Sequence, residues 1–185
     1  MILEGLVTTL STTGEVNLAP MGPIVAPDFS SFILRPFQSS TTYRNLCAVR
    51  SGVLHVTDDV LLIAQAALNR LPQAPATTPA VQVTGVVLVD CCRWFEFVVD
   101  SIDDRTERTE IAARVVHSGR RRDFFGFNRA KHAVLEATIL ATRLHLLSRE
   151  SITAELDRLR PLVEKTAGPQ ERAAWDLVCS VIAGA

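Results

Sequence analysis

Residues 35–46 read Arg35-Pro36-Phe37-Gln38-Ser39-Ser40-Thr41-Thr42-Tyr43-Arg44-Asn45-Leu46. Four successive hydroxyl residues lie between two arginines, where an apolar strand expected at residues 32–35 gives way to a short helix. Hydroxyl groups, the free N–H groups of a helix start and a nearby guanidinium together suit a phosphate. Ser and Thr also cap helices in any protein, and on this run alone a cap is the simpler interpretation.

The composition is that of an ordinary globular protein. Of 185 residues, 48% are hydrophobic and 21% are charged, so the chain is long and apolar enough to bury a sizeable core. The net charge of -1 gives no global basic field, and we therefore expect no nucleic-acid partner. We interpret the one dense basic run, at residues 120–122, as a solvated loop.

The apolar stretches are all interrupted by Arg, Asp or Pro before they reach the length of a membrane span. Near the start, Glu4 and a Thr-rich alternation stand where an export signal would have a basic segment and a continuous apolar stretch. We therefore expect no membrane partner and a cytoplasmic location.

The first half of the chain has the period-two alternation of strands. A hairpin is expected around the Thr13-Gly14 turn, and a short helix is expected at residues 60–71 behind Asp59. Residues 72–79 are rich in Pro and predict a loop. The expected strands cover residues 2–10, 15–19, 32–35, 53–57, 81–92, 94–101 and 110–117.

After Gly126 the hydrophobic period changes to about 3.6. Helices are expected at residues 128–147, from 148 or 151 to 165, and from Pro169 onward. Strands followed by segregated helices indicate an α+β fold. Closing six or seven strands into a small antiparallel barrel would hide the sheet edges.

The sequence contains no motif from which a covalent catalyst can be assembled. It has no Gly-x-Ser-x-Gly elbow, phosphate-binding Walker loop, dinucleotide glycine motif or His-Glu-x-x-His pair. Its four histidines share no metal-ligand spacing, so no metal site is expected. If the protein is an enzyme, a bound cofactor supplies the reactivity.

Several segments occur in an order found in a known superfamily. They are Val7-Thr8-Thr9, the Gly14 turn, Asn17-Leu18-Ala19-Pro20-Met21-Gly22-Pro23, the hydroxyl run, and Gly52-Val53-Leu54-His55-Val56-Thr57-Asp58-Asp59. This order resembles the FMN-binding split barrels. The segment Phe127-Asn128-Arg129-Ala130-Lys131-His132-Ala133, with Glu136 and Arg143, resembles the helical extension of an uncharacterised branch, domain of unknown function 447.

The resemblance implies an antiparallel six-stranded split barrel at residues 1–126, a helical extension at 127–185 packed on it, and a homodimer with FMN at the subunit interface. The phosphate would be held by Ser39, Ser40, Thr41 and Thr42, with Arg35 or Arg44 as counter-charge and Asn45 as an amide contact. The flavin ring would lie beside Pro20, Met21 and Gly22 and would meet Val56, Thr57 and Asp58. With this resemblance, a phosphate site that also caps its helix becomes the favoured interpretation of the hydroxyl run.

Two further groups of polar residues allow alternative interpretations. Arg129, His132 and Glu136 are spaced by three and four and share one helix face, with Asn128 as the expected cap. Such a face is usually solvated or part of a helix-packing network. Alternatively, it covers the flavin, and Arg129 and His132 are then the candidate catalytic residues. His55, within an apolar strand, is expected to be a hydrogen-bonded core residue.

The sequence therefore predicts an FMN-binding flavoprotein, an oxidoreductase of reductase type that transfers hydride to an unknown substrate. The alternative is a non-catalytic protein that carries FMN or uses the barrel as a dimeric scaffold. A role accessory to one-carbon or pterin metabolism is a third possibility, suggested only by the resemblance.

Overall fold

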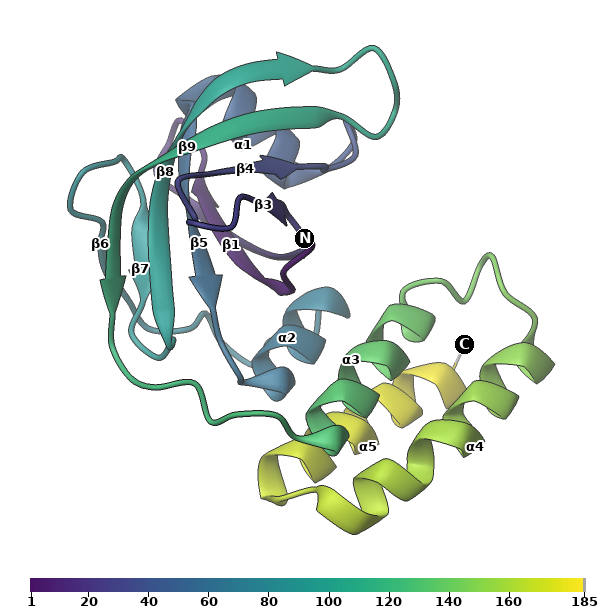
Figure 1. Cartoon of the computed structure of the whole chain (residues 1–185). Coiled ribbons are helices and arrows are strands. Elements are labelled where there is room, and N and C mark those ends of the chain that lie inside the picture. The colour runs from purple at the N-terminus through teal and green to yellow at the C-terminus, as the bar shows by residue number, and fades with distance from the viewer. Residues whose placement is uncertain (185) are drawn as a thin grey trace. The chain divides into compact units, whose positions relative to one another are not determined.

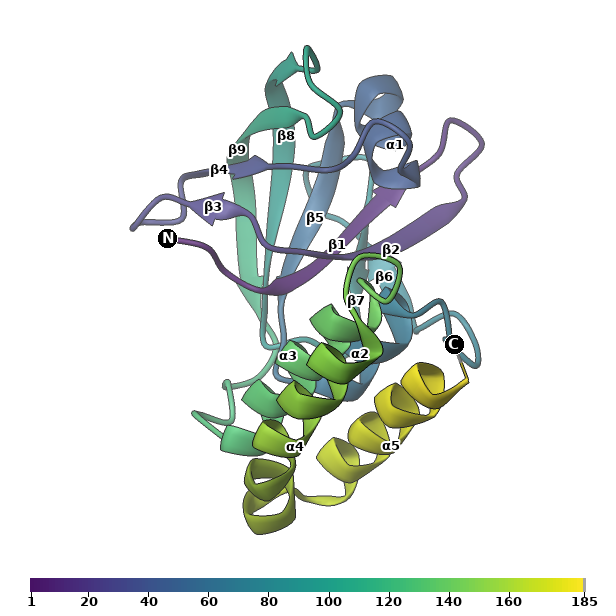
Figure 2. The ribbon, with the colours of Figure 1, turned by 90° about the vertical axis from the view of Figure 1, so that its right-hand side faces the viewer.

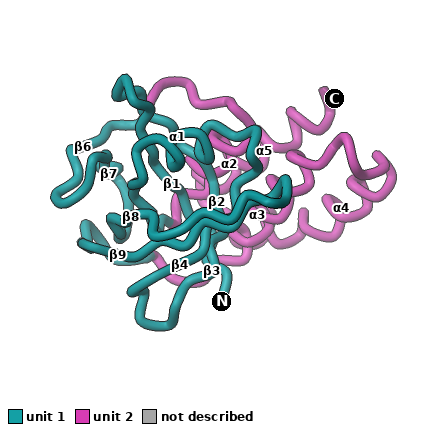
Figure 3. The backbone as a smooth tube through the Cα atoms, turned by 90° about the horizontal axis from the view of Figure 1, so that it is seen from above, with its two compact units in different colours: residues 1–57, 75–124 teal, residues 58–74, 125–185 magenta. Residues whose placement is uncertain are grey.

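The computed structural model describes residues 1–184, which form two compact units. Residues 1–57 and 75–124 form the barrel unit, and residues 58–74 with the chain from residue 125 form the helical unit (Figure 3). Residues 58–74, which the sequence-based division places in the first domain, thus cluster with the later helices. The apolar side chains of this segment account for that, because they belong to the helical core described below.

The barrel unit is built on one curled antiparallel sheet of seven strands, with helix α1 (Thr41–Val49) beside β1 and β2 (Figures 1 and 2). The strand order is β2-β1-β5-β8-β9-β4-β3. The strands are β1 (Gly5–Leu10), β2 (Val16–Met21), β3 (Ile24–Val25), β4 (Ser31–Leu34), β5 (Ser51–Val56), β8 (Arg93–Asp103) and β9 (Glu110–Arg120).

The sheet must curl because its two edge strands are neighbours in the chain. β2 ends at Met21 and β3 begins at Ile24, yet they lie at opposite ends of the strand order. Three residue steps span at most about 11 Å, so the two ends of the sheet must come close together. The predicted α+β split barrel is confirmed.

The predicted number of six strands is wrong. No strand was expected between residues 19 and 32, but β2 extends to Met21, and the short strand β3 follows the interruption at Gly22 and Pro23. Pro23 has no N–H group to donate to a sheet ladder, and its carbonyl instead accepts a hydrogen bond from the Leu3 N–H at 3.1 Å. The strand that exceeds the predicted six is therefore accounted for by β3, a two-residue strand directly after this interruption.

A second difference concerns the region before β8. The predicted strand at residues 81–92 is wrong in extent: only β7 (Val86–Leu88) is formed there, and it pairs with β6 (Thr77–Pro79), in a segment expected to be a loop. The cause is a side chain rather than backbone propensity. The carboxylate of Glu96 accepts hydrogen bonds from the N–H groups of Val81 and Gln82, at 2.9 and 2.6 Å, and so withdraws this segment from strand pairing.

Glu96 is fully buried on β8, and its ionisation reflects these contacts. Burial alone would raise the pKa of Glu96, but the N–H groups of Val81 and Gln82 and the Trp94 indole outweigh it and lower that pKa below its ordinary value. The carboxylate is therefore held in its charged form, with its oxygens occupied by donors.

His55 connects three segments of the barrel unit from a fully buried position on β5. Its Nδ1 lies 3.2 Å from the Leu6 carbonyl oxygen, and its Nε2 accepts a hydrogen bond from the Leu88 N–H at 3.1 Å. These partners require a neutral ring with the proton on Nδ1. The prediction that His55 is a hydrogen-bonded core residue is confirmed.

Burial lowers the pKa of His55 from 6.5 to about 4. As the pH falls below 6.5, His55 binds a proton in the unfolded chain but not in the folded protein. The free energy of unfolding therefore decreases until the pH reaches the lower pKa of His55 in the folded protein. At pH 5 we expect His55 to contribute about 2 kcal/mol less stability than at pH 7. Urea unfolding at both pH values tests this, and a His55→Gln variant should show a correspondingly smaller loss. An equal loss in both proteins would contradict the prediction.

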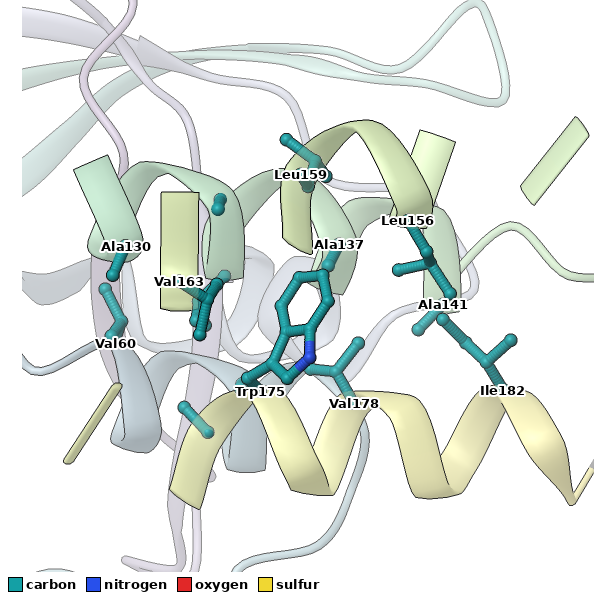
Figure 4. Packing of buried hydrophobic residues seen from close by; sticks show 14 of the residues in the cluster. Val60, Ala130, Ala137, Ala141, Leu156, Leu159, Val163, Trp175, Val178 and Ile182 are labelled. Atoms are coloured by element: carbon teal, nitrogen blue, oxygen red, sulfur yellow. The ribbon is translucent and has the colours of Figure 1, made fainter. Parts of the chain in front are cut away.

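The helical unit consists of α2 (Val60–Ala67), α3 (Arg129–Ala141), α4 (Arg149–Thr166) and α5 (Pro169–Ala183). Figure 4 shows its core, in which Trp175 of α5 lies among side chains from the other helices. Asp59 caps α2, as predicted, by accepting a hydrogen bond from the Leu62 N–H at 2.9 Å. Core members include Val60, Ala130, Ala137, Leu156, Leu159, Val163 and Val178.

Helix α3 ends earlier than predicted. The apolar period suggested a helix to residue 147, but the helix ends at Ala141 and turns follow. Beyond the helix end, Leu144 still packs against the helical core from within these turns, whereas Leu147 is 36% exposed. The predicted start of α4 is confirmed, because Ser148 Oγ accepts a hydrogen bond from the Ser151 N–H.

A buried ion pair connects α3 to α5. Lys131 Nζ lies 2.7 Å from Glu171 Oε1, with side chains only 13% and 9% exposed. The same ammonium donates to the Asp58 carbonyl at 2.7 Å and to Gln170 Oε1 at 3.2 Å, while Glu171 Oε2 accepts from the Gly168 N–H. Both charges are thus satisfied within the helical unit.

Candidate functional site

The hydroxyl run forms the start of α1. Ser40 caps this helix, since its Oγ accepts a hydrogen bond from the Tyr43 N–H at 3.1 Å. The first N–H groups of a helix have no partner within it, which leaves those of Thr41 and Thr42 directed outward along the helix axis. The side chains of Ser39 and Thr41 are exposed. The helix start therefore combines free donors, exposed hydroxyls and the positive end of the helix dipole.

Arg44 is engaged within this turn. Its Nη1 donates to the Ser39 carbonyl at 2.7 Å, and its Nη2 donates to Thr41 Oγ1 at 2.9 Å. The guanidinium thus folds back over the segment that precedes α1 and holds its shape. Because two of its donors are already used, Arg44 is better suited to ordering the turn than to being the main partner of an added anion.

Thr42 and Asn45 hold α1 against the first hairpin. Asn17 Nδ2 donates to Thr42 Oγ1 at 3.1 Å and to Thr9 Oγ1 at 3.2 Å, and Asn45 Nδ2 donates to Thr9 Oγ1 at 3.1 Å. Thr9, Thr42 and Asn45 are 1%, 3% and 6% exposed. This buried network gives both predicted site residues a positioning role in the protein.

Arg35 differs from Arg44 in that its side chain forms no hydrogen bond or ion pair with the described residues. Its Nε is the one buried side-chain nitrogen or oxygen atom among residues 1–184 without a hydrogen bond. An unsatisfied buried donor costs free energy, and a charged one costs more. A turn in which the Ser40 N–H donates to the Phe37 carbonyl at 3.0 Å connects the Arg35 segment to α1. An anion at this helix start would provide the missing acceptor.

The Pro20-Met21-Gly22 segment lies at the end of β2, on the edge of the sheet. In the paired part of β3 and β4, Ile24 lies opposite Ile33. Gly22 lies two residues before Ile24, and Arg35 lies two residues after Ile33. A Cβ atom on Gly22 would lie 3.0 Å from both Glu4 Oε1 and Ile2 Cγ2, so this close approach favours glycine. The bend therefore leads into β3, and Arg35 directly follows β4, the antiparallel partner of β3.

Val56, Thr57 and Asp58 follow β5. Met21 pairs with Gly5, and Leu6 pairs with His55, so Val56 lies on the other side of β1 from Met21. Thr57 is the buried last residue of this part of the barrel unit. Asp58 begins the helical unit, where its Oδ2 accepts a hydrogen bond from the Phe125 N–H at 2.7 Å. The Asp58 carboxylate therefore already has a backbone donor as its partner.

The helix face predicted from residues 128–136 is present on α3. Arg129, His132 and Glu136 are exposed, while the opposite side of α3 is buried in the helical core. Asn128 is the helix cap, as predicted: its Oδ1 accepts from the Ala130 and Lys131 N–H groups. This exposure fits the solvated face as well as the catalytic one, so the catalytic role of Arg129 and His132 stays a prediction.

Sequence reasoning missed two members of the cluster, Thr9 and Asn17. They lie opposite each other in the register of β1 and β2. The available signal was a pair of polar residues facing each other across a predicted hairpin, on the side where the neighbouring strand residue Val7 is buried.

Two features of other protein classes are absent from the described residues. No cluster of three or more His, Cys, Asp and Glu side chains there could hold a metal ion. None of the described helices combines the length and the apolar character that crossing a membrane requires.

Two family models match nearly the whole chain. The N-terminal domain of protein of unknown function DUF447 matches residues 3–122, and a second DUF447 model matches residues 128–180. The chain belongs to the DUF447 family. No curated protein is similar enough to this DUF447 chain to be matched with it.

Solved structures share the fold of this DUF447 protein. An FMN-bound DUF447 protein from Methanosarcina mazei is 22% identical, with a TM-score of 0.82, over 97% of this chain and 94% of the other. The 2-nitrobenzoate 2-nitroreductase of Pseudomonas fluorescens (17% identity, TM-score 0.55) matches 64% of each chain. The styrene monooxygenase flavin reductase of Pseudomonas putida S12 (16% identity, TM-score 0.55) matches 64% of this chain and 80% of its own.

Proposed function

We propose that this DUF447 protein binds FMN in the barrel unit, with the phosphate at the start of α1 and the flavin ring beside the Pro20-Met21-Gly22 bend. The observation that carries the proposal is the buried, unpartnered Nε of Arg35, in the segment that leads from β4 into that helix start. A phosphate would supply its acceptor and the acceptors for the free N–H groups of the first helical turn. The FMN bound by the Methanosarcina mazei relative supports the same cofactor.

The two ends of the proposed site are at a suitable separation. Asn17 donates to Thr42 at the phosphate end, and Met21, at the bend, is four residues further along β2. Four strand residues span about 13 Å, a distance that a ribityl phosphate with its attached ring can bridge. The described residues therefore fit FMN in both chemistry and spacing.

Each part of the site has a distinct role in this proposal. Arg35, Ser39, Ser40 and Thr41 bind the phosphate; Arg44 orders their turn; Thr42 and Asn45 position α1. Pro20, Met21, Gly22, Val56 and Thr57 surround the ring or fix the backbone around it. When bound, FMN supplies hydride transfer, and we propose that the protein is a reductase-type oxidoreductase. The nitroreductase and flavin reductase with the same fold support that reaction class.

We also propose a homodimer with FMN at the subunit interface. The barrel unit exposes several large apolar side chains, among them Ile2, Val16 and Phe37, which are 56%, 50% and 50% accessible. Exposed apolar groups of this size favour burial against a second protein surface. Analytical ultracentrifugation with and without FMN tests this part, and a monomer under both conditions would contradict it.

The test of the proposed function is FMN binding by the purified protein. We expect a yellow protein as isolated, or a saturable shift of the flavin absorption when FMN is added to apoprotein. A colourless protein with no shift would refute the proposal. Rapid reduction of bound FMN by NADH or NADPH would support the reductase, whereas tight binding without reduction by any donor would identify a carrier.

A further inference from the structure

A second site lies within the barrel unit. A pocket of about 480 Å³ opens where β8 begins and β9 ends. Its lining includes Val56, Cys92, Arg93, Gly119, Arg120 and Arg122. Its volume is in the range of small-molecule sites. Two arginines of the basic run, interpreted from the sequence as a solvated loop, thus belong to the wall of a pocket.

Of the three arginines that line this pocket, two are paired with carboxylates. Arg122 Nε lies 2.9 Å from Asp90 Oδ1, and Arg120 forms an ion pair with Asp123. Arg93 has neither an ion pair nor a side-chain hydrogen bond among residues 1–184. The lining therefore keeps a positive charge that no carboxylate neutralises.

Aromatic packing, rather than a counter-ion, positions Arg93. Its guanidinium carbon lies 5.2 Å from the centroid of Phe95 and 5.9 Å from that of Phe29. These two rings are stacked at 4.9 Å. A guanidinium held over aromatic rings keeps its N–H donors available at its edge, where a carboxylate or phosphate can bind in a bidentate manner.

Trp94 lies directly behind the wall of this pocket. A Cβ atom on Gly119 would come within 2.1 Å of the Trp94 ring, so the indole lies across this glycine. The guanidinium carbon of Arg121 lies over the Trp94 ring, 5.3 Å from its centroid. The fluorescence of Trp94 should therefore respond to a ligand in the pocket.

We propose that this pocket binds the anionic group, a carboxylate or phosphate, of a small organic substrate, with Arg93 as its principal cation. The proposal rests on the proposed function, because it places this substrate beside the flavin. Met21 pairs with Gly5 and Val56 pairs with Arg93, so the bend and the pocket occupy one end of the sheet, on either side of β1. A molecule anchored at Arg93 extends past Val56 toward the bend.

The test uses Trp94 as the reporter. The chain has two tryptophans, so a Trp175→Phe variant leaves Trp94 alone. We expect pyrophosphate and citrate, titrated at constant ionic strength, to change its fluorescence in a saturable way. Adding Arg93→Ala should weaken this binding about tenfold or more, because a charge-assisted contact is lost. The matched control is Arg114→Ala: Arg114 is exposed on the neighbouring strand β9, is not part of the pocket lining, and lies 3.6 Å from the Asp100 carboxylate.

The outcomes separate this proposal from FMN binding. Loss of anion binding in Arg93→Ala, with unchanged FMN affinity, supports the pocket as a substrate subsite. No saturable response, equal effects of Arg93→Ala and Arg114→Ala, or a matching loss of FMN affinity overturns it. Anion binding that depends on Arg93 in a protein that does not bind FMN supports the anion site and refutes the proposed function. Calorimetry on the protein with both tryptophans gives the same comparison if Trp175→Phe does not fold.

Discussion

Replacement of Arg35 by alanine is expected to weaken FMN binding about 10- to 150-fold, the equivalent of one or more lost hydrogen bonds to a charged group. The Arg35 Nε is buried and has no acceptor in the protein. A phosphate at the start of α1 would satisfy it, so the interaction is gained only when the ligand binds. Titration followed by quenching of flavin fluorescence measures the effect.

Two comparisons make this prediction specific. Arg44→Ala should weaken FMN binding less, because the donors of Arg44 are already used by Ser39 and Thr41. Riboflavin lacks the phosphate, so its affinity should be similar in the natural protein and in Arg35→Ala. A larger effect of Arg44→Ala, or an equal loss of riboflavin binding, would show that Arg35 is not the phosphate's counter-charge.

Replacement of Lys131 by methionine is expected to destabilise the protein by about 3–5 kcal/mol, since it leaves a buried carboxylate without its partner. Lys131 and Glu171 are 2.7 Å apart and almost completely buried. The variant loses the attraction but keeps the cost of removing Glu171 from water. Chemical denaturation followed by circular dichroism measures the change in the free energy of unfolding.

The double variant Lys131→Met, Glu171→Met is the control for this effect. It removes both charges, so it should recover much of the stability lost in the single variant. Although burial raises it, the pKa of Glu171 is lowered overall by Lys131 and by backbone donors. The stabilisation is therefore complete above the ordinary glutamate pKa and is lost as the pH falls through the lowered one. A double variant no more stable than the single would contradict this account.

The parts of the fold that follow from local chemistry could be predicted. The hairpin of β1 and β2 follows from alternation and a glycine turn, with Gly14 at a φ of 85°. The helix caps at Asp59, Asn128 and Ser148 follow from residue type. The shortened β7 could not be predicted, because a carboxylate from the next strand takes two N–H groups that the sequence pattern assigns to a ladder.

The candidate site was predicted only in outline. The hydroxyl run and the bend stand out by residue type, and their order in the chain carried the resemblance. Which hydroxyls face a ligand depends on tertiary contacts: Thr42 is buried against Asn17, whereas Thr41 is exposed. The distinction between Arg35 and Arg44 also depends on partners several residues away, which composition and spacing do not contain.

The chain passes between the two units three times, after residues 57, 74 and 124. Helix α2 contributes Val60 and Ala64, which are 2% and 0% exposed, to a core otherwise made by α3, α4 and α5. A gene fragment that ended after β9 would therefore encode a protein in which the apolar side chains of α2 lack their packing partners. Fusion of a single C-terminal segment to a complete barrel therefore does not account for the helical unit. Exchange of this unit between family members would require two segments, residues 58–74 and the chain from residue 125, to be replaced together.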